Sequence, residues 1–215
     1  MEQRFTGFPE AALDFYDDLE LDNTRSFWQA HKQVYDEAVR GPMLALTAAL
    51  AEEFGDAKVY RPYRDVRFAK DKTPYKSHQG AFVASGPATG WYVQIGSPGV
   101  RVGAGYYRAD GPDLARIRTA IDTDHSGKEL ERILRRLEKR GFEVNGEQLK
   151  TAPRGYARDH PRIDLLRYTT MAVGKSYGFE KLIHTPALLD RVREDWRDLR
   201  PLVEWVAARV GSVDA

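Results

Sequence analysis

Residues 80–107 read GAFVASGPATGWYVQIGSPGVRVGAGYY, and this stretch decides the fold class. It contains three short runs rich in Val, Ile, Phe, Tyr and Trp, at 80–85, 90–96 and 100–107. Gly86-Pro87 separates the first two runs, and Ser97-Pro98-Gly99 separates the second from the third. Short apolar runs divided by Gly and Pro turns are typical of consecutive antiparallel strands. The stretch therefore predicts a three-stranded meander.

The segments on both sides of this meander have helical patterns. Apolar residues recur at helical spacing from residue 9 to residue 54, with an interruption or a kink expected at Gly41-Pro42. Amphipathic helices are predicted near 112–121 and 126–137, and a last helix after Thr185-Pro186 should kink at Pro201. Asn145-Gly146 is a favoured two-residue turn and predicts a short hairpin over 142–149.

No repeat, low-complexity segment or linker divides the chain. We therefore expect one α+β domain over residues 1–215. Its central sheet should be mostly antiparallel, with helices from the N- and C-terminal regions packed on it.

Composition narrows the class of protein. The 215 residues are 42% hydrophobic and 30% charged, as in an ordinary globular protein, and the formal net charge is only +1. That balance argues against general electrostatic coating of nucleic acid. The absence of cysteine excludes disulfides, thiolate nucleophiles, zinc ribbons and iron–sulfur clusters. Without a signal-peptide pattern or an apolar run of about 18–20 residues, the expected location is cytoplasmic, with no membrane partner.

No motif predicts a metal or a cofactor. Asp122-x-Asp124-x-Ser126-Gly127 matches the front half of an EF-hand loop, but the position of the bidentate glutamate is Ile133. Paired zinc-binding histidines, a phosphate-binding glycine loop, a dinucleotide fingerprint and a nucleophile elbow are also missing from the sequence.

Positive charge is concentrated in residues 61–76. This segment holds six Lys or Arg side chains against two Asp, a net charge of +4 in a chain of net charge +1. Guanidinium groups match phosphate and carboxylate oxygens bidentately, so the segment predicts an anion site. The expected ligand contacts are Arg61, Arg64, Arg67, Lys72 and Tyr75. In the alternative interpretation, Asp65 and Asp71 neutralise their neighbours in a salt-bridged strand and turn.

A second cluster occupies residues 153–162. Arg154 and Arg162 add charge beside the start of a helix, and His160 could move a proton near neutral pH. In the alternative, His160 caps the helix and Arg162 pairs with Asp159 or Asp164. His78, which follows the basic segment, is the other candidate acid or base. We expect the two clusters to approach each other in space.

The basic segment also carries a family resemblance. Arg61-x-x-Arg64-Asp65-x-Arg67-Phe68, followed by Lys72-x-x-Tyr75, resembles the signature of a family of conserved hypothetical proteins from bacteria and some fungi. Further likeness lies in Phe5-x-Gly7-Phe8-Pro9, Trp28-x-x-His31-Lys32-x-x-Tyr35, Pro153-Arg154-Gly155-Tyr156, His160-Pro161-Arg162 and Leu165-Leu166-Arg167. The family is a domain of unknown function, so the resemblance implies a full-length single domain and no particular activity.

These observations leave three hypotheses. The first is binding, with or without metal-independent turnover, of a phosphorylated or polyanionic small ligand in a cleft lined by Arg, Lys and Tyr. The second is a single-stranded nucleic-acid-binding module, in which aromatic side chains stack on bases. The candidates for stacking are Tyr63, Phe68, Tyr75, Trp91 and Tyr92. The third is a structural or partner-binding protein in which a buried arginine network holds helices to the sheet.

Overall fold

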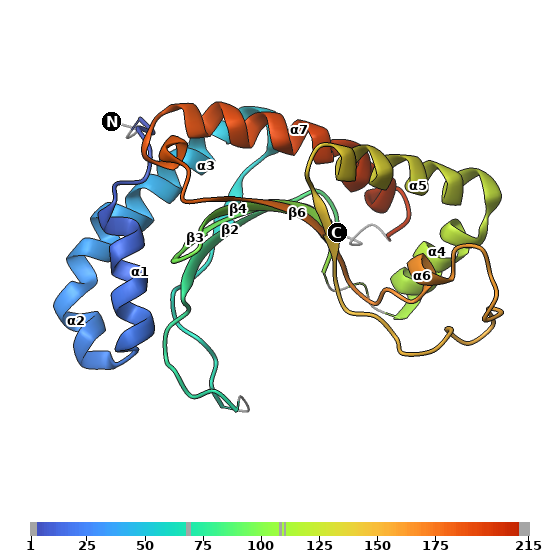
Figure 1. The fold of residues 1–215 in the computed structure, drawn as a ribbon, viewed down its shortest axis with the longest axis horizontal. Helices are drawn as coiled ribbons and strands as arrows, with labels where there is room; N and C mark the ends of the chain where they lie inside the picture. The colour runs from blue at the N-terminus through green and yellow to red at the C-terminus, as the bar shows by residue number, and fades with distance from the viewer. Residues whose placement is uncertain (1–3, 68–69, 108, 110, 211–215) are drawn as a thin grey trace. The chain divides into compact units, whose positions relative to one another are not determined.

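The computed structural model describes residues 4–67, 70–107, 109 and 111–210, and it has an α+β fold (Figure 1). The helices are α1 (Ala11–Leu21), α2 (Arg25–Val34), a π-helical turn η1 (Tyr35–Arg40), α3 (Gly41–Phe54), α4 (Gly111–Asp122), α5 (Asp124–Lys139), α6 (Ile163–Leu166), a 3₁₀ turn η2 (Lys181–His184) and α7 (Ala187–Ala207). The strands are β1 (Ala57–Val59), β2 (His78–Ala84), β3 (Thr89–Gly96), β4 (Gly99–Tyr106), β5 (Glu143–Asn145) and β6 (Met171–Gly178).

The strands form one antiparallel sheet in the order β1-β2-β3-β4-β6-β5. Strands β2, β3 and β4 are the meander that residues 80–107 predict. The hairpin predicted over 142–149 is wrong, because β5 pairs with β6 instead, with Val144 opposite Val173. Gly146 leaves the strand at a φ of +146°, where a Cβ atom would lie 2.1 Å from the carbonyl oxygen of Thr170. Gly146 therefore allows the backbone after β5 to approach the backbone of Thr170 closely, and it does not belong to a two-residue turn.

The chain divides into two compact units, each assembled from three separate segments. Unit 1 comprises residues 1–83, 92–102 and 176–194, and unit 2 comprises residues 84–91, 103–175 and 195–215. The division falls inside β2, β3, β4, β6 and α7, so both units draw on the same strands and on the same helix.

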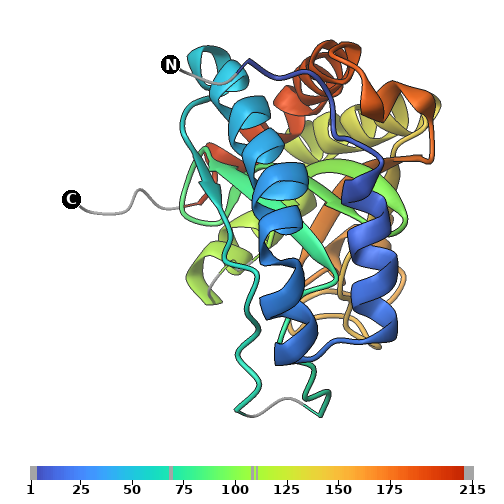
Figure 2. The same ribbon diagram turned by 90° about the vertical axis from the view of Figure 1, so that its left-hand side faces the viewer.

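In unit 1, α2, η1 and α3 follow one another in a continuous rod, and α1 lies beside this rod (Figure 2). The expected interruption at Gly41-Pro42 does not occur. The N–H of Gly41 donates to the carbonyl of Asp36, five residues earlier, in the wider π-helical turn. Pro42 then lies in the first turn of α3, where a missing N–H and a fixed φ are tolerated.

The strands of unit 1 are buried on one face and half-exposed on the other. Val83, Val93 and Ile95 belong to the buried core, as do Leu46 and Leu50 of α3. Because side chains alternate along a strand, the residues between them lie on the opposite face. His78, Tyr92, Gln94 and Arg101 are the half-exposed polar residues of these strands.

In unit 2, α5 lies along the later part of α7 (Figure 1). The indole N–H of Trp205 on α7 donates to the carbonyl of Ser126 on α5 at 3.1 Å, a distance typical of an N–H···O hydrogen bond. The kink expected at Pro201 does not end the helix, since α7 continues past it to Ala207. Trp91 of β3 donates in the same way to the carbonyl of Trp196, at 3.0 Å.

Candidate functional site

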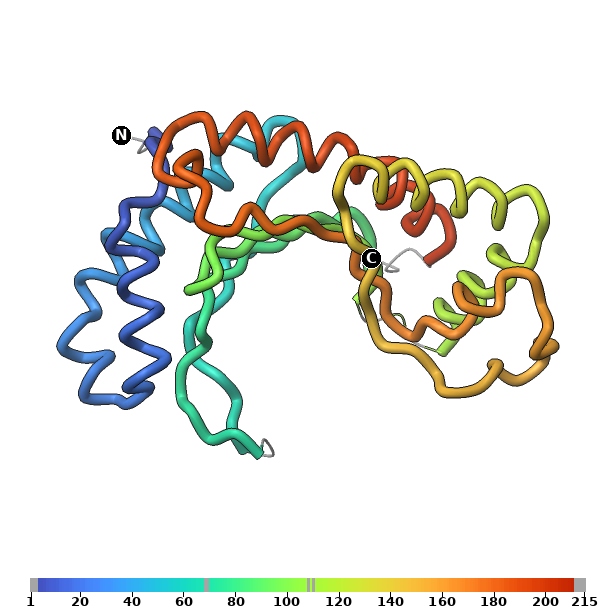
Figure 3. The backbone as a smooth tube through the Cα atoms, viewed as in Figure 1, coloured from blue at the N-terminus to red at the C-terminus, as the bar shows by residue number. Residues whose placement is uncertain are grey.

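The basic segment forms an extended hairpin that leaves the sheet between β1 and β2 (Figure 3). Its two arms are joined by backbone hydrogen bonds from Arg64 N–H to Pro74 and from Lys76 N–H to Pro62, both 2.8 Å long. Asn23 holds the hairpin from outside, because its side-chain amide donates to the carbonyl of Tyr75 and accepts from the Tyr75 N–H. We call the two arms, residues 61–67 and 70–76, the basic hairpin.

An aromatic cluster anchors the base of the basic hairpin. The ring of Tyr75 stacks on Trp28 of α2 with a centroid distance of 4.3 Å and an interplanar angle of 8°. Tyr63 packs against both rings and is 48% exposed. Tyr75, a predicted ligand contact, is only 5% exposed, so its ring mainly fixes the hairpin to α2.

The cations of the hairpin differ in how they are paired. Arg64 donates to the carboxylate of Asp71 and, at 2.6 Å, to the hydroxyl of Thr73. Arg67 holds Asp65 bidentately, with bonds of 3.0 and 2.7 Å. The Thr73 N–H and the Arg64 guanidinium lower the pKa of Asp71 to about 2, and the bond from Arg67 lowers the pKa of Asp65. These contacts match the alternative interpretation for Arg64 and Arg67.

The other predicted ligand contacts of the hairpin, Lys72 and Arg61, have few partners within the chain. The ammonium of Lys72 donates to the carbonyl of Val66 at 2.9 Å and remains exposed. Arg61 is exposed and makes no ion pair with any residue that the structure describes. Phe68, a candidate for base stacking, lies outside the described residues.

At the foot of the hairpin, half-exposed polar side chains occupy one face of the sheet in unit 1. Tyr92 lies across Gly80, where an added Cβ would be 2.3 Å from the phenolic oxygen, and its hydroxyl donates to Gln94 at 2.9 Å. His78 lies beside Gly96 on the neighbouring strand. We call His78, Tyr92, Gln94 and Arg101, together with Lys76 at their edge, the open sheet face.

The open sheet face is electropositive and partly desolvated. Burial, together with the charge of Lys76, lowers the pKa of His78, so this imidazole is neutral at pH 7. Burial and the charge of Arg61 lower the pKa of Lys76, whose ammonium lies 5.3 Å from the ring centre of Tyr60. Arg101 is close enough to Tyr92 for its charge to oppose the rise in pKa that burial produces there. Among the described residues, no carboxylate pairs with Lys76, His78 or Arg101.

The second cluster belongs to unit 2 and is built around contacts within that unit. The Nδ1 of His160 accepts from the N–H of Arg162 at 3.0 Å, and Nε2 lies 3.0 Å from the carboxylate of Asp122. Because Nδ1 accepts, Nε2 carries the proton that is donated to Asp122. His160 therefore joins the loop before α6 to the end of α4.

Arg162 is 7% exposed and is surrounded by acceptors. It donates to Asp124 at 2.8 Å, lies 3.3 Å from Glu131, and points two further contacts of 3.4 Å at the carbonyls of Ile121 and Asp122. A Cβ on Gly127 would lie 2.8 Å from its Nε, so the guanidinium packs directly against the backbone of α5. Arg154, by contrast, is exposed and makes no ion pair with a described residue.

The fold brings together several cations that no sequence motif marks. A hollow of about 280 Å³ in unit 2 is lined by Lys150, Thr151, Ala152, Arg158, Ile163 and Arg167. Arg101 and Gln94 of the open sheet face were also missed, because only the register of β3 and β4 puts them beside Tyr92. The basic hairpin lies in unit 1 and the second cluster in unit 2, so neither unit by itself contains both predicted clusters.

In residues 4–67, 70–107, 109 and 111–210, no group of three His, Asp or Glu side chains is arranged to hold a metal ion. None of the helices in the described part of the chain has the length and apolar character needed to cross a bilayer.

Comparison with known proteins gives one match. The model of a family described as "Conserved hypothetical protein (DUF2461)" matches residues 11–205. No curated protein and no solved structure matches the chain.

Proposed function

The chain belongs to this family of conserved hypothetical proteins (DUF2461), and we propose that it binds a small anionic ligand, phosphorylated or polycarboxylate, on the open sheet face of unit 1. The observation that carries the proposal is that Lys76 and Arg101 lie on the same half-buried face as a neutral His78, and that no described carboxylate balances their charge. A partly desolvated cation without a counter-charge is stabilised when an anion binds.

The neighbouring groups suit the rest of such a ligand. The hydroxyl of Tyr92 and the amide of Gln94 can donate to or accept from an oxygen-rich molecule. Arg61 extends the positive charge along the first arm of the hairpin. His78 can accept a proton at pH 7 and is the group we assign to proton transfer if the ligand is turned over. Ligand contacts through Arg64, Arg67, Lys72, Arg154 and Arg162, and proton transfer by His160, remain predictions.

Thermal unfolding with added anions tests the proposal. Phosphate, sulfate and citrate should raise the melting temperature of the wild type, because a ligand that binds only the folded state stabilises it by about 2.7 kcal/mol at a hundredfold excess over Kd. Arg101→Gln and Lys76→Gln should abolish this shift. Lys181→Gln, at an exposed lysine of η2 outside the predicted sites, is the matched control and should keep it. Equal shifts in all four proteins would contradict a site on the open sheet face.

A second function is favoured by one observation. Tyr60 and Tyr92 lie close together on the same side of the sheet as Lys76 and Arg101, and aromatic rings with cations on a sheet face are used to bind single-stranded nucleic acid. Trp91, also predicted to stack on bases, is 5% exposed on the other side of β3 and is committed to Trp196. Fluorescence anisotropy with labelled single-stranded DNA and RNA tests this function. Binding should weaken with salt at a log–log slope of roughly −0.7 per phosphate contacted.

A further inference from the structure

The exposed side of α5 carries a row of cations. Arg132, Arg135, Arg136, Lys139 and Arg140 recur every three or four residues, all are exposed, and these five line a shallow hollow of about 460 Å³. At 1.5 Å per residue the row is about 12 Å long. Like charges three and four residues apart on a helix repel one another, so the row is unfavourable for the isolated chain. We call these five residues the basic row.

Ion pairs within the chain reach only part of the basic row. Asp198 of α7 contacts Arg140 and lies 3.9 Å from Arg136. Arg132, Arg135 and Lys139 form no ion pair with any residue in the described part of the chain. An acidic partner would therefore relieve repulsion as well as add contacts.

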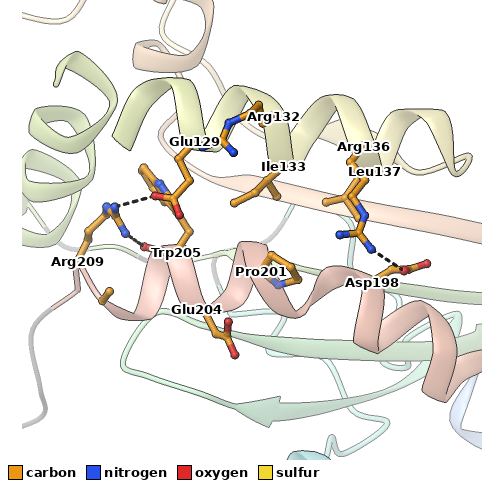
Figure 4. Close-up of a pocket in the computed structure, with 11 residues that line it drawn as sticks. Glu129, Arg132, Ile133, Arg136, Leu137, Asp198, Pro201, Glu204, Trp205 and Arg209 are labelled. Carbon is orange, nitrogen blue, oxygen red and sulfur yellow. Dashed lines mark hydrogen bonds and ion pairs between the residues drawn. The ribbon is translucent and has the colours of Figure 1, made fainter. Parts of the chain in front are cut away.

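A groove of mixed character runs beside the basic row, between α5 and α7 (Figure 4). Its volume is about 480 Å³, and its apolar lining is Ile133, Leu137, Pro201 and Ala208. Charged residues complete the lining: Arg132, Arg136 and Arg209, together with Glu129, Asp198 and Glu204. Trp205 is not available for stacking on a base, because it is 3% exposed and the guanidinium of Arg209 covers its ring at 4.0 Å. The groove therefore offers a place for an aliphatic side chain beside the basic row, and its carboxylates disfavour a strand of nucleic acid.

Helix α1 of the same protein has the complementary surface. No Lys or Arg occurs between Arg4 and Arg25. Asp14, Asp17 and Asp18 are exposed on α1, Asp22 follows its last residue, and none of the four makes an ion pair with a described residue. Leu21, at the end of α1, is 88% exposed, the largest exposed fraction among the large hydrophobic residues described.

We propose that α1 of one molecule docks on the basic row and groove of a second copy of the chain. With the helices antiparallel, Asp14, Asp18 and Asp22 come opposite Arg140, Arg136 and Arg132, since each set is spaced by four residues. Leu21 then comes opposite Ile133 and enters the groove. Antiparallel packing also places the positive end of each helix dipole near the negative end of the other. This self-association does not depend on the proposed anion ligand.

Sedimentation velocity on the full chain tests the proposal directly. At about 50 mM salt the sedimentation coefficient should rise with protein concentration, and at about 500 mM salt the protein should return to the mass of a single chain, because screening weakens exposed charge pairs. A single-chain mass at every concentration and at both salt levels overturns the proposal.

Reciprocal charge reversal identifies the two surfaces. Arg132→Glu with Arg136→Glu changes the basic row, and Asp18→Arg with Asp22→Arg changes α1; each double variant should be monomeric. Mixing the two variants should restore association, because each then offers the other one native and one reversed contact. Failure of the mixture to associate, while both variants keep the wild-type circular dichroism spectrum, overturns the proposal.

Two further variants and one probe complete the design. Lys150→Glu with Arg158→Glu reverses the same amount of charge elsewhere in unit 2 and should leave association unchanged. Leu21→Asn should weaken association at least several-fold without changing charge. A labelled DNA duplex is the competing probe: loss of duplex binding in the Arg132→Glu, Arg136→Glu variant, with self-association intact, would assign the basic row to nucleic acid and overturn the proposal.

Discussion

The phenol of Tyr92 lies across Gly80, so that a Cβ atom on Gly80 would be 2.3 Å from the Tyr92 hydroxyl and 2.8 Å from two carbons of its ring. The ring of Tyr92 thus lies over the backbone of Gly80, and its hydroxyl donates to Gln94. The shape of the proposed ligand surface therefore depends on the absence of a side chain in the neighbouring strand.

Replacing Gly80 by alanine should displace Tyr92. Inserting one methyl group into a packed contact destabilises a protein by about 1–3 kcal/mol, and we expect a loss in that range together with loss of anion-induced stabilisation. Chemical denaturation and thermal melts with phosphate measure both effects. Gly111→Ala is the control, since a Cβ there meets nothing within 4 Å and should leave anion binding unchanged.

The two best-paired arginines should respond differently to substitution. Arg162→Gln should lower stability by about 1–3 kcal/mol, because it leaves the buried carbonyls of Ile121 and Asp122 without their donor. Arg67→Gln should leave the melting temperature unchanged, because the Arg67 side chain is 77% exposed and its pair with Asp65 is solvated. Equal melting temperatures for the two variants would contradict a structural role for Arg162.

Stability should depend on pH through His78. Its pKa is lowered in the folded protein, so below about pH 6.5 the unfolded chain binds more protons than the folded one. The stability associated with the neutral form of His78 is fully present above the pKa of the unfolded chain, about 6.5. It is lost as the pH falls from there through the lower pKa of the folded protein. The free energy of unfolding should therefore decrease between pH 7 and pH 5.5, and less steeply in His78→Gln. Asp71, with a pKa of about 2, titrates well below this window.

Removing the Asn23 side chain should release the basic hairpin. Asn23→Ala deletes both amide contacts to the backbone of Tyr75, and a buried backbone group left unpaired costs about 1–3 kcal/mol. Trypsin should then cut faster at Arg67, Lys70 and Lys72, as followed by mass spectrometry. Gln33→Ala is the control. It removes only an exposed hydrogen bond to Glu37, so trypsin should cut this variant at the wild-type rate.

The chain should unfold as one domain, because the division between the units falls inside four strands and α7. Trp28 reports on unit 1, whereas Trp91, Trp196 and Trp205 report on unit 2. Fluorescence of the Trp28→Phe variant should therefore give the same urea midpoint as the circular dichroism of that variant. Two separate midpoints, or a stable proteolytic fragment ending near residue 55, would show independent units.

Local signals predicted the strands of the meander, because a Gly-Pro turn and alternating apolar residues act over only a few positions. The partner of β5 could not be read in this way. Asn145-Gly146 has the composition of a tight turn, yet β5 pairs with β6, almost thirty positions further on in the register of Val144 and Val173. The choice between a local and a distant partner depends on burial in the whole sheet, which no short motif encodes.

The candidate site likewise has a part that the sequence could predict and a part that only the fold reveals. The pairing of Arg64 and Arg67 with aspartates of their own segment was one of two interpretations that the sequence allowed. Arg101 became a candidate only through strand register. The cations of the basic row recur at helical spacing in the sequence. The net charge of the whole chain does not reveal them, because acidic residues elsewhere, those of α1 among them, balance their charge.

The π-helical turn η1 has a consequence for how this sequence can change in length. An α-helix advances by about 100° per residue, so one extra residue in an ordinary helix would turn Met43, Leu46 and Leu50 away from the side that carries Trp28 and Tyr35. The wide turn of η1 takes in one more residue than an α-helical turn over nearly the same rotation, and therefore absorbs that residue. Deleting one residue between Asp36 and Arg40 should restore an ordinary helix and leave the apolar side of α3 in place, whereas a deletion inside α3 before Leu46 should rotate that side by about 100°. A change of length is therefore tolerated at η1 and not in the helix that follows it.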